Sequence, residues 1–289
     1  MLWATSHLEF GGGTLRSTVF LERRLRLHVV QRDRLLFDSA FAPPARTPGA
    51  FVHLFVQLSG TFVIAGRPPL HAPCALVLDE SEFDRVMPGS LTFRSFGARC
   101  TIVELRMPSG DIRRPIGLGL GAIDLDPSVW DAYRALAAEP NDQGAHRLLT
   151  ALSATGVVSP ELAASVMTHE PDRFQRVWAV LRPLYGNIAV SAGLKDIQPL
   201  ARLSTRQLSR DLTDLIGTFG LFGGGFREAM RVIRLRAAVL LLSAPDATPS
   251  AVARLVGYGS LDAMGRAFRD AKLRAPSLVQ SEVRFREAP

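Results

Sequence analysis

The sequence predicts an α+β protein, with strands gathered in its N-terminal third and only helices in its C-terminal third. Two observations carry this prediction: short apolar or alternating runs broken by turn residues fill residues 15–107, whereas helical spacing governs the chain from residue 127 onward. A length of 289 residues, 47% of them hydrophobic, suffices for about two packed domains. We therefore expect a β-rich domain over residues 1–125, a helical segment over 126–185 and an all-α domain over 186–289.

Strand-like runs recur at close spacing in the N-terminal part. Turn-forming pairs such as Ser59-Gly60 and Pro88-Gly89 separate these runs. Many short strands of this kind predict a sandwich or a barrel. The clearest runs cover residues 51–58, 61–65, 75–78, 91–95 and 100–106.

The middle of the chain changes to helical spacing. Pro127, Pro160 and Pro171 stand at or near first turns, where the missing N–H of proline does no harm. The large side chains of Trp130, Tyr133 and Trp178 fit a homodimer interface as well as packing against the strands, so both interpretations stay open. The predicted helices cover residues 127–139, 144–154, 160–168 and 172–185, and residues 186–193 are predicted to form a linker.

Three glycine clusters punctuate the sequence, at residues 11–13, 117–121 and 223–225. None precedes a Lys-Ser/Thr pair or opens a helix after a strand, so phosphate-binding loops are not indicated. We interpret them as a turn, a loop and a flexible connection, and we expect no cofactor.

The cysteines and the N-terminus indicate the compartment. Cys74 and Cys100 are the only cysteines and fall within strand-like segments, so we expect two buried free thiols. The first residues lack the pattern of a secretory signal, and no run reaches the ~20 apolar residues of a membrane span. We therefore expect a cytoplasmic protein with no membrane partner.

The positive charge is concentrated toward the C-terminus. Residues 1–171 contain 16 Arg against 17 Asp and Glu, whereas residues 172–289 contain 18 Arg and Lys against 10 Asp and Glu. The resulting net charge of +8 on the second part favours a polyanionic partner. Double-stranded DNA is the partner that we expect.

A helix over residues 205–216 would bury a stripe of Leu208, Leu212 and Leu215. Ser204 stands at its N-cap position, and residues 196–202 supply a short preceding helix. Together these segments form a helix-turn-helix unit, which can place its second helix in the major groove of DNA. The other face of that helix offers arginines and hydroxyls suited to base edges and phosphates, namely Thr205, Arg206, Ser209, Arg210 and Thr213.

A second unit of the same kind follows after a long apolar helix over residues 229–243, which can hold the two units apart. Its supporting helix contains Ala253 and Val256, and Gly257 suits a turn position with a positive φ. Its second helix would bury Met264, Ala267, Phe268 and Ala271. The outward face is a weaker reading surface, with Leu261, Asp262, Gly265, Arg266 and Arg269.

Several spaced elements in this region resemble the DNA-binding domain of the AraC/XylS family of bacterial transcription regulators. The resemblance covers about residues 186–285. It is carried by Ser204-x-Arg206-Gln207-Leu208-x-Arg210, by Arg234-Leu235-Arg236-Ala237-Ala238-x-Leu240-Leu241, and by Gly257-Tyr258 with Arg266-Ala267-Phe268 and Pro276. The chain departs from the family pattern in a glycine-rich insertion at residues 219–225, and in Asp262, Ala263, Gly265 and Leu273 of the second unit.

The resemblance implies two helix-turn-helix units on one face of DNA, with base or phosphate contacts from Arg206, Ser209, Arg210 and Arg266. It also implies an N-terminal cupin-like β-barrel that senses a small-molecule effector and a helical segment that dimerises. RNA polymerase is a compatible further partner. The effector, the target sites and the direction of regulation stay open.

Three side chains of the 51–58 run share one face and are candidates for an effector pocket: His53, Phe55 and Gln57. A core histidine with satisfied hydrogen bonds, or one on the outside of the domain, is the simpler interpretation of His53. Residues 15–107 contain only His28, His53 and His71, without a His-x-His pair followed by Glu, so we expect no metal site.

Two other functions compete with a DNA-binding regulator. An enzyme built on the β-barrel would need a catalytic motif, and neither a nucleophile elbow, a zinc-protease motif, a Cys/His cluster nor a close carboxylate pair is present. An interaction module with a decayed second unit would explain Asp262 and Gly265. We expect a regulator rather than an enzyme.

Overall fold

The computed structural model describes residues 1–38, 41, 51–64, 68–79, 93–113, 121–165, 170–187, 193–221 and 225–287. Within these ranges one antiparallel sheet runs in the order β1-β2-β3-β8-β5-β7-β9, with β4 paired to β8 and β6 to β5. The strands are β1 Leu2–Phe10, β2 Gly13–Leu21, β3 Arg26–Asp33, β4 Phe37–Asp38, β5 Phe51–Ile64, β6 Leu70–His71, β7 Cys74–Asp79, β8 Phe93–Pro108 and β9 Gly121–Ala122. The chain therefore forms an α+β fold.

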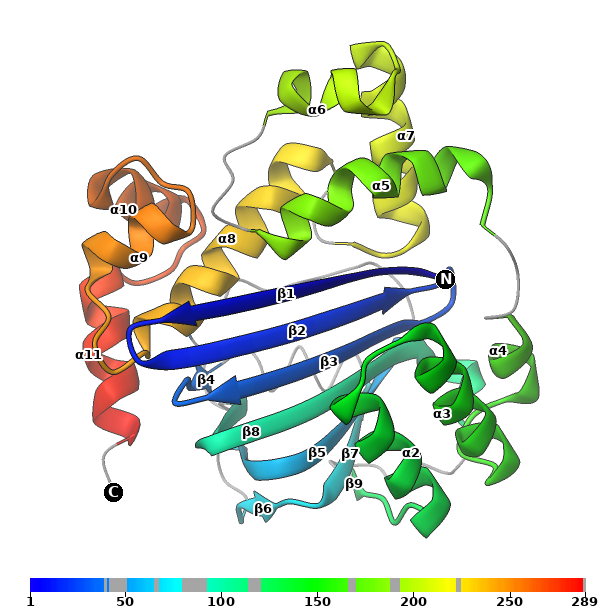
Figure 1. Ribbon diagram of the computed structural model, residues 1–289. Coiled ribbons are helices and arrows are strands. Elements are labelled where there is room, and N and C mark those ends of the chain that lie inside the picture. The colour runs from blue at the N-terminus through cyan, green and yellow to red at the C-terminus, as the bar shows by residue number, and fades with distance from the viewer. Residues whose placement is uncertain are drawn as a thin grey trace.

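The helices follow the sheet in the sequence. Figure 1 shows α5 lying along β1, while α2 and α3 lie against one face of the sheet, near β3 and β8. No helix in the described ranges is long and apolar enough to cross a membrane. The helices are α2 Pro127–Ala138, α3 Asp142–Ala154, α4 Pro160–Ser165, α5 Asp172–Gly186, α6 Leu194–Ala201, α7 Thr205–Thr218, α8 Phe226–Leu242, α9 Pro249–Leu255, α10 Leu261–Asp270 and α11 Pro276–Glu287.

The two faces of the sheet have different neighbours. One face packs against α2 and α3. Its core contains alternate residues of β3, β5 and β8, among them Val29, Leu54 and Val103, together with Tyr133 of α2 and Leu148 of α3. The other face holds a separate apolar cluster of Phe55, Phe62, Ile64, Leu76, Leu78, Cys100 and Ile102. Charged side chains, described below, lie on that same face.

A tight hairpin joins β1 and β2. Gly11 and Gly12 have φ values of +56° and +76°, which suits the two-residue turn between Phe10 and Gly13. The tip of this hairpin meets the segment between α8 and α9: the Asp246 amide donates to the Gly11 carbonyl at 2.9 Å. A Cβ atom at position 11 would lie 3.0 Å from the Ala247 nitrogen, so both this close approach and the positive φ favour glycine.

Strand boundaries differ from the sequence prediction in three places. The runs at 51–58 and 61–65 belong to one strand, β5, because Gly60 (φ +88°) and the register shifts around Ser59 make a bulge rather than a turn. The runs at 91–95 and 100–106 likewise belong to β8, although residues 91 and 92 lie outside the described residues. Strands also begin at Leu2 rather than near residue 15.

The predicted helices are confirmed within a few residues. Leu208, Leu212 and Leu215 are buried, as are Met264 and Phe268, while Ala267 and Ala271 are partly buried. Residues 65, 114–120, 166–169, 188–192 and 222–224 lie outside the described residues. Those gaps contain most of the predicted loop at 117–121, the end of the predicted helix at 160–168, and parts of the linker and of the glycine-rich insertion.

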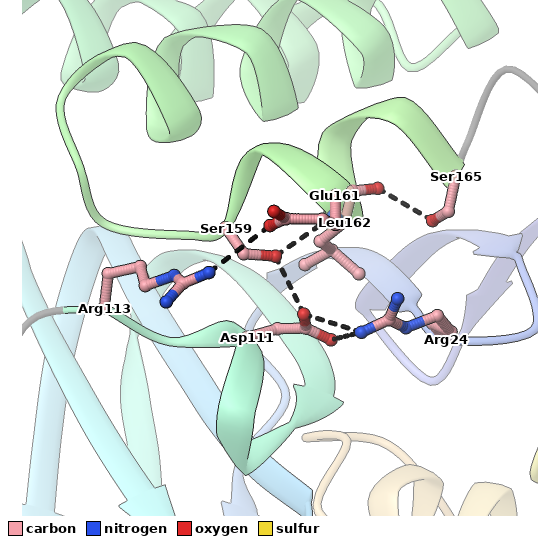
Figure 2. Close-up of polar contacts among 7 residues, drawn as sticks. All are labelled: Arg24, Asp111, Arg113, Ser159, Glu161, Leu162 and Ser165. Atoms are coloured by element: carbon pink, nitrogen blue, oxygen red, sulfur yellow. Dashed lines mark hydrogen bonds and ion pairs between the residues drawn. The ribbon is translucent and has the colours of Figure 1, made fainter.

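A buried carboxylate ties the sheet to the helical segment (Figure 2). Asp111 follows β8 and accepts hydrogen bonds from Arg24 Nη2 on both oxygens at 2.7 Å, and from Ser159 Oγ at 2.8 Å. Ser159 Oγ also accepts from the Leu162 amide at 3.0 Å, near the start of α4. One side chain thus links the β2–β3 turn, the end of β8 and α4.

Candidate nucleic-acid interface

The first helix pair consists of α6 and α7. Arg202, with φ +53°, ends α6 in the left-handed region, and the Gln198 side chain donates to the Leu203 carbonyl at 2.6 Å. Ser204 Oγ then accepts from the Gln207 amide at 3.2 Å and caps α7, as the sequence predicts. The turn is therefore held by local hydrogen bonds, while α7 packs through its leucine stripe.

One face of α7 is free of packing. All five predicted contact residues are exposed: Thr205, Arg206, Ser209, Arg210 and Thr213. They line a hollow of about 670 Å³ together with Leu194 and Asp214. The Arg210 Nε lies 3.7 Å from Asp211 Oδ1, and the Thr213 hydroxyl donates to the Ser209 carbonyl at 2.9 Å. The face is consequently polar, basic and open to a ligand.

The second helix pair, α9 and α10, repeats this construction. Thr248 Oγ1 caps α9, and Ser260 Oγ caps α10 by accepting from the Ala263 amide at 3.1 Å. Gly257 stands at the turn with φ +80°, which confirms the predicted positive value. Met264 and Phe268 anchor α10 in the core beneath it.

The open face of α10 carries less chemistry than that of α7. Asp262, Arg266 and Arg269 are exposed, and a Cβ atom at Gly265 would meet nothing within 4 Å. These residues line a smaller hollow of about 300 Å³ with Leu261 and Ser277. The face offers two arginines and one carboxylate. None of the four predicted outward residues between 262 and 269, namely Asp262, Gly265, Arg266 and Arg269, has a hydroxyl group.

Helix α8 joins the two pairs and packs against both. Ala229 and Met230 belong to the core that contains α6 and α7, whereas Leu235, Val239 and Leu242 belong to the core that contains α9, α10 and α11. The same second core includes Leu35 and Leu36, which precede β4. The two pairs are thus fixed to one helix and, through it, to the sheet.

The predicted effector residues lie on the face of β5 that points away from α2 and α3. His53, Phe55 and Gln57 are all buried. The rings of His53 and Phe55 are stacked with centroids 5.8 Å apart, and Phe55 meets Phe62 edge-on at 6.2 Å. This face therefore brings aromatic and polar side chains together.

A charged cluster that the sequence prediction missed occupies the same face. Glu104 of β8 accepts from His53 Nδ1 at 2.8 Å and from Arg26 Nη2 at 3.1 Å. Burial alone would raise the pKa of Glu104, but Arg26 and His53 outweigh it and hold the pKa well below its usual range. Nothing local in the sequence marks this cluster, because its members come from three strands.

Helix α8 reaches the same cluster through Arg236. Burial lowers the pKa of this guanidinium to about 10, while the charge of Glu104 opposes the shift. Burial likewise lowers the pKa of His28 to about 4. In the described ranges, no three His, Cys, Asp or Glu side chains gather in a way that could hold a metal ion.

No family model and no curated protein sequence matches the chain. Among solved structures, it is similar to ToxT from Vibrio cholerae O395, with 11% identity, coverage of 91% of this chain and 99% of that chain, and a TM-score of 0.35. An unsaturated-fatty-acid-bound ToxT from Vibrio cholerae strain SCE256 matches with 11% identity, 90% and 96% coverage and a TM-score of 0.36.

The AraC-like transcriptional activator CuxR matches with 12% identity, 78% and 80% coverage and a TM-score of 0.30. The family that the C-terminal motifs resemble is therefore represented among the structural neighbours.

Proposed function

We propose that this protein is a sequence-specific DNA-binding transcription regulator of the AraC/XylS type. The observation that carries the proposal is a repeated arrangement: two helix pairs, α6–α7 and α9–α10, each expose arginines on their second helix. We interpret each pair as a helix-turn-helix unit. Both units lie in the part of the chain with a net charge of +8, which suits a DNA backbone.

The two units have different roles in this proposal. Arginines and hydroxyls on α7 read base edges, with Arg206, Ser209 and Arg210 as the main contacts and Thr205 and Thr213 beside them. Arg266 and Arg269 of α10 hold phosphates and fix the register. Asp262 either accepts a hydrogen bond from a cytosine amine or weakens DNA binding by this helix pair. The second outcome is also what a decayed second unit would show.

The N-terminal part, residues 1–125, is the sensor in this proposal, a cupin-like barrel whose small-molecule effector binds near His53, Phe55 and Gln57. Residues 126–185 form the linker or homodimer segment, and residues 186–289 form the DNA-binding domain. RNA polymerase is the partner that such a regulator would recruit or exclude. Arg236 supports coupling between the parts, because it belongs to α8 and interacts with Glu104.

Selection of bound fragments from the source organism's DNA tests the proposal. Purified full-length protein should enrich a small set of fragments that share a sequence, and Arg206→Ala/Arg210→Ala should lose that enrichment. Failure of the wild-type protein to bind any duplex at low salt would refute the DNA-binding function and favour an interaction module. Catalytic activity in a protein that does not bind DNA would favour the enzyme hypothesis.

A further inference from the structure

We infer that α8 is a third DNA-binding element, whose arginines hold backbone phosphates between the two helix pairs. The inference rests on the proposed function and adds a site to it. The phosphates concerned are those that border the minor groove lying between the two major-groove segments contacted by α7 and α10.

The site is a hollow of about 860 Å³ between the two pairs. Ser209 of α7 lines one side, and Tyr258 and Ala267 of the second pair line the other. Ser209 also belongs to the hollow over the open face of α7, so the two hollows adjoin. A duplex lying across both pairs would therefore pass over this hollow.

Helix α8 forms the floor of the hollow with three arginines and one carboxylate. Arg227, Arg231 and Arg234 are spaced four and three residues apart, so they share one face of the helix. Like charges at this spacing destabilise a helix. Glu228 is the sole acidic residue in the described lining, so the positive charge is largely uncompensated there. A concentration of positive charge on one helix face points to an anionic ligand.

Two of the three arginines are available to such a ligand. Arg227 and Arg231 are exposed, and neither makes an ion pair with another described residue. The guanidinium group is planar and forms paired hydrogen bonds with phosphate oxygens, which suits a DNA backbone.

Tyr258 provides an independent indication of a ligand. Its hydroxyl is buried and has no hydrogen-bonding partner in the part of the chain that the structure describes. Burial raises the pKa of this hydroxyl, with Arg234 and Arg231 as the nearby charges that oppose the shift. Because a buried donor without a partner is costly, a phosphate oxygen drawn in by these arginines would supply the missing acceptor.

The test is the salt dependence of binding to a mixed-sequence duplex of about three helical turns, measured by fluorescence anisotropy. Arg227→Gln/Arg231→Gln should reduce the slope of log Kobs against log salt by about 1.8, since each lost phosphate contact removes about 0.9. Tyr258→Phe should weaken binding without changing the slope, because a neutral donor releases no counterion. Sequence preference should stay unchanged in both variants.

The matched control is Arg16→Gln/Arg147→Gln, which removes the same charge from exposed positions on β2 and α3. A slope for Arg227→Gln/Arg231→Gln equal to that of this control would overturn the inference. The proposed function would survive that result if Arg206→Ala/Arg210→Ala still lost sequence preference. A wild-type protein without affinity for the duplex would refute both.

Discussion

The backbone amide of Leu36 donates a buried hydrogen bond to Ser243 Oγ at 2.9 Å, across 207 residues of sequence. Leu36 precedes β4 in the sheet, and Ser243 ends α8, where its hydroxyl also donates to the Leu240 carbonyl at 2.6 Å. The sheet is therefore joined by a specific polar contact to the helix that connects the two helix pairs.

Ser243→Ala should lower the free energy of unfolding by about 1–3 kcal/mol, because the buried Leu36 amide loses its acceptor. Urea unfolding followed by circular dichroism measures this difference. Ser281→Ala on α11 is the control, since its hydroxyl also donates to the carbonyl three residues earlier but is exposed. Equal effects of the two substitutions would show that the Leu36 contact contributes nothing.

Asp111→Ala should lower the free energy of unfolding by about 1.5–3 kcal/mol, the range for hydrogen bonds to a charged group. The substitution leaves Arg24 and Ser159 without their shared acceptor. Asp131→Ala removes another Asp–Arg contact, but this one is exposed and should cost about 0–1 kcal/mol. Similar chemical-denaturation midpoints for both variants would contradict a structural role for the buried carboxylate.

Glu22 should make stability depend on pH near neutrality. Burial, followed by a hydrogen bond to Glu170, raises the pKa of Glu22 to about 7 from 4.5. The folded state therefore keeps a proton that the unfolded state has released, so this group destabilises the fold as pH rises from about 4.5 through 7. Glu22→Gln, which mimics the protonated carboxyl, should be more stable than wild type at pH 8 and match it more closely at low pH.

The measurement is a series of unfolding curves between about pH 5 and 8. Burial lowers the pKa of His28 from 6.5 to about 4, and that group has the opposite effect, because protonation of the unfolded imidazole lowers stability below pH 6.5. Both proteins contain His28, so its contribution cancels when their free energies of unfolding are subtracted at each pH. A difference that stays constant with pH would contradict the raised pKa of Glu22.

Arg210→Ala should reduce affinity for a selected DNA fragment by about 1–3 kcal/mol if this side chain reads a base. Affinity for unrelated duplexes should change less, since the specific contact is absent there. Competition titrations with the fragment and a scrambled duplex measure both values. Unchanged affinity for the fragment would remove Arg210 from the interface, and equal losses on both duplexes would assign it to phosphate.

Arg266→Ala should mainly change the salt dependence, lowering the slope by about 0.9 while preserving sequence preference. The physical reason is that its neighbours on α10 offer little base-reading chemistry, with Gly265 beside it and Asp262 one turn away. The same titrations at several salt concentrations provide the measurement. Loss of preference as large as that of Arg210→Ala would give α10 an equal share in sequence reading.

The sequence predicted the C-terminal helices well because each helix carries its own signal. The leucine stripe of α7, the Ser204 cap and the positive φ of Gly257 are consequences of residues within four positions of each other. The exposed faces of α7 and α10 followed from those stripes.

Long-range features were not predictable in this way. The cluster around Glu104 depends on the register that brings β3, β5 and β8 together, and Arg236 joins it from a helix more than a hundred residues later. Strand β1 was missed because it buries only Leu2 and Ala4 while most of its other side chains are partly open, which leaves a weak hydrophobic signal. The hollow at α8 likewise depends on how α8 packs between the two helix pairs.

The β1–β2 hairpin extends from α5, beside the first helix pair, to the turn before the second pair. Near one end, the Trp3 carbonyl accepts from Trp178 Nε1 of α5, which packs with α6 and α7, and the other end abuts the turn that leads into α9. The two helix pairs are therefore connected twice, through α8 and through this hairpin, so their relative position is braced at two separate points.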